Sequence, residues 1–232
     1  MQPELRYSNK DSQIAGLAIA PNKVLRSTYW MLGLTMIPTI LGALLGVGAN
    51  FSFLAQSPIM GPLLMLAVMM GLMFAINATR NSVWGIVLLF GFTFVAGWWL
   101  GPMLQYALHF KNGAHLVGTA AAGTGIIFFT LAGIATVTRK DFGFMGNFLF
   151  VGLILLIIAS VANLFFAMPA ASLAISGISV LLFSGFILFD VSRIIHGGET
   201  NYVMATLGIY LSIYNLFVSL LQLLMAFSGD RD

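Results

Sequence analysis

The sequence predicts an all-α membrane protein, a bundle of seven transmembrane helices, from three observations. Hydrophobic residues make up 59% of the 232 residues and charged residues only 7%, whereas a soluble globular domain carries about 25% charged residues. Several uncharged stretches are long enough to cross a bilayer, which takes about 20 mostly apolar residues. Short polar or proline-containing breaks separate these stretches, so one compact helical domain is the simplest organisation.

The elements follow from these stretches in chain order. Residues 1–27 are mostly polar and lack the basic start and apolar run of a signal peptide, so we expect a cytoplasmic tail. The long uncharged stretch after this tail breaks between Asn50 and Pro58, and a later one breaks at Met168-Pro169. The predicted spans are 28–49, 58–78, 83–104, 116–137, 146–167, 171–191 and 202–227, followed by a short C-terminal tail, 228–232.

The distribution of Lys and Arg predicts the orientation. With the N-terminus inside, most cations fall on the cytoplasmic side, as the positive-inside rule requires. That side holds Arg6, Lys10, Lys23, Arg26, Arg80, Arg139, Lys140 and Arg193, and the outer side holds Lys111 and Arg231. An odd number of spans then places the C-terminal tail on the outer side of the membrane.

The residue inventory excludes most other function classes. The chain has 17 charged residues (10 basic plus 7 acidic), where a soluble protein of this length has roughly 58. A net charge of +3 gives no basic stripe for nucleic acid, and the absence of cysteine excludes disulfides and thiolate metal sites. All three histidines, His109, His115 and His196, fall in predicted loops. We therefore expect no catalytic residues, no metal site, no cofactor and no enzyme.

Small residues predict close helix packing. Gly42 and Gly46 form a small-xxx-small pair in the first span, and Gly97 and Gly101 form another in the third. Gly118, Gly123 and Gly125 surround a run of alanines in the fourth span. Such residues let helix backbones approach closely in lipid, so we expect packing contacts at all three places.

Asp190 is the acidic residue that falls within a continuous apolar span. A carboxylate at that depth is costly and usually faces the bundle interior or a water-filled cavity. Arg193 follows at i+3 on the same helix face. Two interpretations stay open, a proton- or cation-sensing carboxylate on a pathway and an Asp–Arg pair that ends the helix.

The last span carries an unusual polar face. Its members are Tyr210, Ser212, Tyr214, Asn215, Ser219 and Gln222. A helix with this much polarity is expected to lie among other helices rather than in lipid, and Asn163 of the fifth span and Ser184 of the sixth could join its network. The face is either interhelical hydrogen bonding or the polar lining of a conduction path.

Three segments together resemble the Bax inhibitor-1 family, in its bacterial, YccA-like branch. They are Ile194 to Tyr202, which contains His-Gly-Gly-Glu-Thr-Asn-Tyr, Ile209 to Phe217, and Thr138 to Phe142. The resemblance runs from about residue 23 to residue 227. It implies a seven-helix bundle with the last helix in the centre, wrapped by the other six. It also implies an inner-membrane protein that modulates a membrane-anchored AAA protease, FtsH-like, as its partner beside the lipid bilayer.

The resemblance also suggests an alternative function. Some members of the family are pH-sensitive calcium leaks, in which two aspartates on helices six and seven form the sensor and an arginine near the end of helix two latches it. Asp190 matches the first aspartate and Arg80 lies in the arginine region, but Ser212 stands where the second aspartate is expected. Because the carboxylate pair is incomplete, protease modulation is favoured over a leak for Ca²⁺ or H⁺ with Asp190 as the titrating group.

Overall fold

The computed structural model describes residues 21–51 and 60–229, and throughout these ranges the regular secondary structure is helical. The helices are α2 (Pro21–Gly48), α4 (Met60–Thr79), α5 (Val83–Trp99), α6 (Gly101–Leu108), α7 (Gly113–Thr138), α8 (Gly146–Phe166), α9 (Pro169–Ile195) and α10 (Tyr202–Ser228), with a 3-10 turn, η1 (Gly143–Met145), before α8. Six spans are long and apolar enough to cross a membrane, with α5 and α6 counted as one span, and the shorter apolar helix Leu63–Thr79 lies within α4. The predicted all-α bundle of seven helices is confirmed.

Two boundaries differ from the prediction in an informative way. The third span, expected as one helix over 83–104, ends as α5 at Trp99 and restarts as α6 at Gly101. Pro102 lies in the first turn of α6, where its missing N–H breaks the hydrogen-bond ladder of a continuous helix. The first helix begins at Pro21, inside the predicted tail, and proline is common at the first position of a helix.

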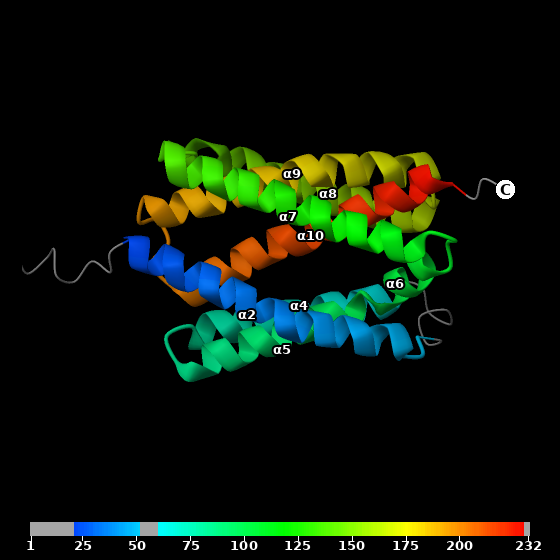
Figure 1. Cartoon of the computed structure of the whole chain (residues 1–232), viewed down its shortest axis with the longest axis horizontal. Helices are drawn as coiled ribbons and strands as arrows, with labels where there is room; N and C mark the ends of the chain where they lie inside the picture. The colour runs from blue at the N-terminus through cyan, green and yellow to red at the C-terminus, as the bar shows by residue number, and fades with distance from the viewer. Residues whose placement is uncertain (1–20, 52–59, 230–232) are drawn as a thin grey trace, which may run out of the picture.

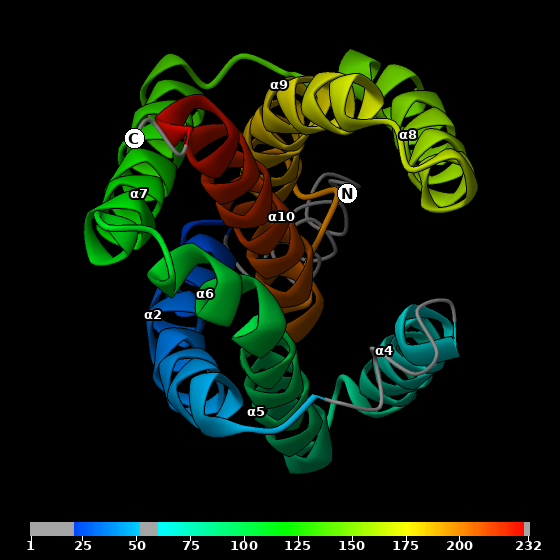
Figure 2. The same ribbon diagram turned by 90° about the vertical axis from the view of Figure 1, so that its right-hand side faces the viewer.

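The last helix lies at the centre of the bundle, as the resemblance implied. Figure 2 shows α10 surrounded by the other helices, and it packs against α9, α7, α2, α5 and α4. One detail differs, because α8 packs against α9 and η1 rather than against α10. Leu149 is the one buried residue of α8, and its span has a mean hydropathy of 2.7. A helix this apolar is stable in contact with lipid and needs no place in the core.

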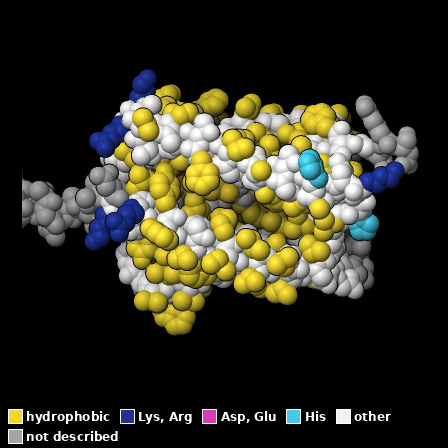
Figure 3. Space-filling view, viewed as in Figure 1, with side chains coloured by type: hydrophobic (Ala, Val, Ile, Leu, Met, Phe, Trp, Pro, Cys, Tyr) yellow, Lys and Arg dark blue, Asp and Glu magenta, His cyan; other side chains and the backbone are white. Residues whose placement is uncertain are grey.

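The bundle has two halves with α10 between them. In Figure 1, α2, α4 and α5 lie on one side of α10, and α7, α8 and α9 lie on the other. The main core lies where these halves meet α10, and it contains Phe92, Ile187, Ile209 and Leu216, all fully buried. Figure 3 shows hydrophobic side chains spread along the face in view, and many large hydrophobic side chains of the described residues are exposed, as lipid contact requires.

One end of the bundle gathers the positive charge. Here α2 and α10 begin and α4, α7 and α9 end. We call it the basic end, and it carries Arg26, Arg80, Arg139, Lys140 and Arg193. Figure 3 shows dark blue side chains clustered at the end where α2 begins.

Two of the three predicted glycine contacts are present. A Cβ on Gly42 would overlap the Phe94 carbonyl oxygen, and a Cβ on Gly97 would overlap the Thr39 carbonyl oxygen. A Cβ on Gly101 would lie 2.5 Å from the carbonyl oxygen of Gly46. The two glycine pairs therefore allow α2 to lie directly on α5 and α6.

The third prediction, close packing at the α7 glycines, is wrong. A Cβ on Gly118 or Gly125 would meet nothing within 4 Å, and one on Gly123 would make only ordinary contact with Leu220. The physical reason is that no extensive contact joins α2 to α7 among the described residues. Gly118 and Gly125 therefore face open space, and Gly123 faces a side chain of α10 rather than a neighbouring backbone.

Candidate functional site

The two tyrosines of the predicted polar face join α10 to α2 and α5. Tyr210 is fully buried, its hydroxyl lies 3.0 Å from that of Thr39 on α2, and it donates to the Thr93 carbonyl of α5 at 3.3 Å. The Tyr214 hydroxyl donates to the Ala96 carbonyl at 3.2 Å. These bonds favour interhelical bonding over a conduction path as the role of the two hydroxyls.

The other polar side chains of this face form hydrogen bonds either within α10 or to α9. Asn215 Nδ2 donates to the Leu211 carbonyl at 2.8 Å, and Ser219 Oγ donates to the Asn215 carbonyl at 2.7 Å. Both bonds stay within α10. Ser176 Oγ of α9 donates to Gln222 Oε1 at 2.7 Å, which joins these two helices.

The prediction that Asn163 joins this network is wrong. Its Oδ1 accepts from the Met168 backbone N–H at 3.1 Å. The side chain is therefore used at the turn where α8 ends, because Ala167 takes a left-handed conformation there and brings the Met168 amide back towards the helix.

Asp190 and Ser212 lie together where α9 meets α10. The Asp190 Oδ2 atom lies 3.5 Å from the position of a Cβ on Gly208, so the carboxyl group faces α10 across a residue without a side chain. The buried Ser212 hydroxyl reaches both the Gly208 carbonyl, at 3.2 Å, and the Asp190 carboxyl. It has one proton for these two acceptors.

The Asp–Arg pair, one of the two interpretations left open for Asp190, is not formed with Arg193 among the described residues. The Nη2 atom of Arg193 lies 3.4 Å from Glu199 Oε2, and its Nε donates to the Gly198 carbonyl at 3.2 Å. The cause is the turn after α9, where Gly197 has φ +75° and the Gly198 amide donates to the Arg193 carbonyl at 2.8 Å. This turn brings Glu199 back over Arg193, whose charge still acts on Asp190 electrostatically.

Asn201 connects this turn to the opposite half of the bundle. As the N-cap of α10, its Oδ1 accepts from the amides of Val203 and Met204 at 3.0 and 3.1 Å. Its Nδ2 donates to the Arg80 carbonyl at 3.1 Å and to Asn81 Oδ1 at 2.8 Å. Arg80 thus takes part through its backbone, while its side chain is exposed and donates to Asn77 at 3.4 Å.

A second set of bonds fastens the linker between α7 and α8 to the end of α9. Ser192 Oγ accepts from the Phe142 amide at 2.9 Å and donates to the Lys140 carbonyl at 3.2 Å. The His196 ring lies 3.1 Å from the Arg139 carbonyl through Nε2. We call the bonds of Asn201, Ser192 and His196 together the basic-end staples. Sequence reasoning missed them, although an Asn directly before an apolar helical run is a recognisable N-cap signal.

Within the described ranges, no three His, Asp or Glu side chains come together as metal ligands. Two carboxylates at the basic end each have a partner of their own. Glu199 pairs with Arg193, and Asp141 accepts a hydrogen bond from the Gly143 amide at 2.7 Å. The chemistry available here is hydrogen bonding and charge pairing between helices.

Comparison with known proteins identifies relatives along nearly the whole chain. The family model described as "Inhibitor of apoptosis-promoting Bax1" matches residues 21–229. A protein of Escherichia coli strain K12 named "Modulator of FtsH protease YccA" is 42% identical over 212 residues, covering 91% of this chain and 94% of that protein. An "Uncharacterized membrane protein" of Vibrio cholerae is 43% identical over 203 residues, covering 88% and 89%. The region that the family model matches, residues 21–229, includes all the described helices.

Proposed function

The chain belongs to the Bax inhibitor-1 family, and from this premise we propose that it binds and modulates a membrane-anchored AAA protease of the FtsH type. The carrying observation is the 42% identity to the modulator of FtsH protease from Escherichia coli over 94% of that protein's length. The family model matches residues 21–229, which include every described helix. The proposal therefore takes protease modulation from a relative that is similar to this chain along the whole helical bundle, not in one segment of it.

The proposed location is the bacterial inner membrane. A relative from another strain of Escherichia coli carries the name "Inner membrane protein YccA", and its identity and coverage are the same as those given above. The concentration of Lys and Arg at the basic end supports an N-terminus in the cytoplasm and a C-terminus in the periplasm.

The structure suggests how such a bundle resists a protease that pulls on its substrates. Extraction from the cytoplasmic side must first open the basic end, where the staples join α4, α7, α9 and α10. Behind them, the Tyr210 and Tyr214 hydroxyls join α10 to α2 and α5. A protein that engages the protease without being extracted occupies it, which slows the degradation of other substrates.

The polar N-terminal tail is the proposed handle for the protease. Residues 1–20 lie outside the described residues, and their sequence is mostly polar, which suits a segment that a cytoplasmic protease grips. Photo-crosslinking in native membranes, followed by purification, tests the binding. We expect the full chain to capture the AAA protease and a chain lacking residues 1–20 to insert normally but capture much less. Equal absence of the protease from both samples refutes the proposal.

A second candidate function, an ion or proton path, is favoured by one observation. The carboxyl group of Asp190 faces the central helix at Gly208 and Ser212, which is the position of the first sensor aspartate by resemblance. On this proposal Asp190 and Ser212 form the sensor, Arg193 modulates it electrostatically, and the segment around Arg80 latches it through Asn201. Ion flux through purified protein in liposomes tests the proposal, because a protease modulator without a path gives the flux of empty liposomes.

A further inference from the structure

A large apolar groove separates α2 from α7. It has a volume of about 990 Å³ and is lined by α2 and α7 as walls, α10 as floor and α6 at one end. Figure 1 shows the two helices lying apart on either side of α10, and Figure 3 shows hydrophobic side chains around a hollow on the same face. We call this space the lateral groove. It faces outward between two membrane spans, towards the lipid.

The small residues in its walls leave the groove open. A Cβ on Gly33 of α2, or on Gly125 or Gly133 of α7, would meet nothing within 4 Å. Gly42 and Gly97, by contrast, lie directly against the backbone of a neighbouring helix. An apolar space of this size within a bilayer forfeits the dispersion contacts of its lining unless an apolar group fills it. The lateral groove therefore needs an occupant.

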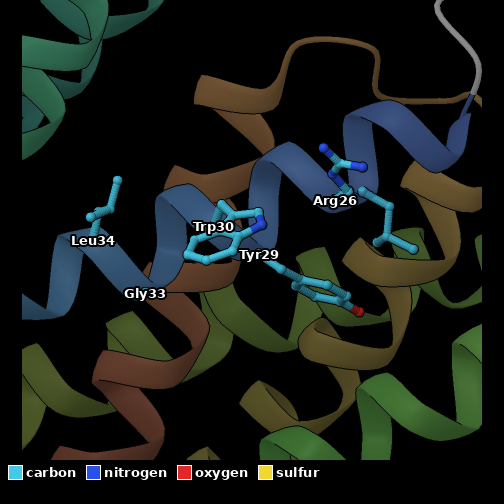
Figure 4. A pocket seen from close by; sticks show the side chains of 6 residues that line it. Arg26, Tyr29, Trp30, Gly33 and Leu34 are labelled. Atoms are coloured by element: carbon cyan, nitrogen blue, oxygen red, sulfur yellow. The ribbon is translucent and has the colours of Figure 1, made fainter.

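One polar group at the groove has an unused hydrogen-bonding capacity. The Tyr29 hydroxyl is buried and makes no hydrogen bond of good geometry to any described residue. The Thr136 hydroxyl of α7 lies across the groove from it, but Thr136 gives its proton to the Ala132 carbonyl at 2.7 Å and is not placed to accept the proton of Tyr29 in good geometry. Figure 4 shows Tyr29 pointing away from α2 towards the neighbouring helices. A buried hydroxyl without a good partner is costly, so an acceptor on the occupant would satisfy it.

The mouth of the groove at the basic end is positively charged. Arg26 lies one turn before Tyr29, and Arg139 lies one turn after Thr136. Because α2 begins and α7 ends at the basic end, Arg26 lies closer to that end than Tyr29, and Arg139 lies closer to it than Thr136. Both arginines are exposed, and neither forms an ion pair with a described residue. Trp30, 70% exposed beside Arg26, is a residue type enriched at the membrane–water interface.

From this arrangement we propose that the lateral groove binds an anionic phospholipid. One acyl chain lies between α2 and α7 on the α10 floor. The phosphate lies at the basic end between Arg26 and Arg139, and Tyr29 donates a hydrogen bond to a headgroup or ester oxygen. Charge complementarity commits the site to an anionic lipid, because a zwitterionic headgroup offers the two arginines no net charge to pair with.

Native mass spectrometry of the purified full chain tests this proposal with phosphatidylglycerol and phosphatidylethanolamine added separately. The Arg26→Gln, Arg139→Gln double variant should bind phosphatidylglycerol about 25-fold more weakly, at about fivefold for each cation removed. Its binding of phosphatidylethanolamine should change little. Arg80→Gln, which removes a cation of the same end outside the groove, is the matched control and should leave both lipids unchanged.

Filling the groove should abolish the site for either lipid. In the Gly125→Leu, Gly133→Leu double variant, the new side chains occupy open space, so the fold is kept. The matched control is Gly71→Leu, Gly91→Leu, because a Cβ at these glycines of α4 and α5 also meets nothing within 4 Å and neither lines the groove. Thermal unfolding verifies that both double variants remain folded.

Three outcomes overturn the proposal. The first is undiminished phosphatidylglycerol binding by the groove-filled variant, which places the lipid elsewhere. The second is an equal loss of both lipids in the arginine variant, which removes the anionic preference. The third is a change from dimer to monomer on filling the groove with no change in bound lipid, which assigns the groove to a second copy of the chain.

Discussion

Replacement of Gly97 by alanine tests the close packing of α2 on α5, the most extensive helix contact outside α10. The new methyl group would overlap the Thr39 carbonyl oxygen and lie 2.8 Å from the carbonyl carbon. Both atoms belong to the backbone, so relief requires the helices to separate. Separation also loosens Thr39 from Tyr210, whose hydroxyls lie 3.0 Å apart.

The magnitude follows from two opposing effects. Overpacking of a well-packed site costs about 1–3 kcal/mol, and a rigid backbone neighbour favours the upper end of that range. Alanine gains about 1 kcal/mol over glycine in helix propensity. Gly97→Ala should therefore lower the free energy of unfolding by about 2 kcal/mol. Gly91→Ala, on the same helix with no atom within 4 Å, gains the propensity without the clash.

Reversible unfolding by sodium dodecyl sulfate in mixed micelles, followed by circular dichroism, measures both variants. The difference between them isolates the clash, because both receive the same propensity gain. Gly97→Ala should unfold at a lower mole fraction of the denaturing detergent than the original protein, and Gly91→Ala at an equal or higher one. If the two variants unfold together, α2 and α5 do not pack as closely as described.

Three further predictions concern the basic end and the orientation. Asn201→Ala should lower the free energy of unfolding by about 2–4 kcal/mol, because it removes an N-cap and two hydrogen bonds. Asn201→Asp keeps the oxygen that caps α10 and should lower the free energy of unfolding by about half as much. The same detergent titration measures both variants, and equal losses would contradict the double role of Asn201. If the second candidate function holds, Asp190→Asn should abolish any pH dependence of ion flux in liposomes. Ser212→Asp should make that pH dependence steeper, because a second carboxylate then shares the proton with Asp190. A steep pH response that persists in Asp190→Asn would place the sensor elsewhere. A reporter fused after Asp232 should be periplasmic and one fused after Lys140 cytoplasmic, and a cytoplasmic C-terminal reporter would contradict an odd number of spans.

The spans could be predicted from the sequence because lipid imposes one strong condition on it. Uncharged stretches of about 20 residues have few alternatives to a membrane helix, and the predicted spans match the helices closely. The break at Leu100 between α5 and α6 was missed, although Pro102 was a visible signal for it. The contacts of the glycine pairs, Gly42 with Gly46 in α2 and Gly97 with Gly101 across α5 and α6, were predicted correctly, because small residues at a four-residue spacing favour close approach.

The same glycine rule failed in α7, and the reason is three-dimensional. The sequence identifies Gly125 as a small residue, but it does not tell which helix lies opposite. In the structure Gly125 faces the lateral groove and not the backbone of another helix. In the same way, the i+3 spacing of Asp190 and Arg193 was real, but the turn at Gly197 gave Arg193 a different partner, Glu199. The proximity of Asp190 to Ser212 came from the resemblance, since no pattern within one helix encodes a contact between two.

The central claim, modulation of an FtsH-type protease, is tested most directly by a degradation rate in a defined system. The purified protease is reconstituted in proteoliposomes with a membrane-anchored substrate, and the full chain is added at increasing ratios. The account predicts that degradation of the substrate slows as the ratio rises, while the chain itself stays intact and another multi-span membrane protein at the same ratio has no effect. An unchanged degradation rate at saturating ratios, or rapid destruction of the chain itself, would contradict the account.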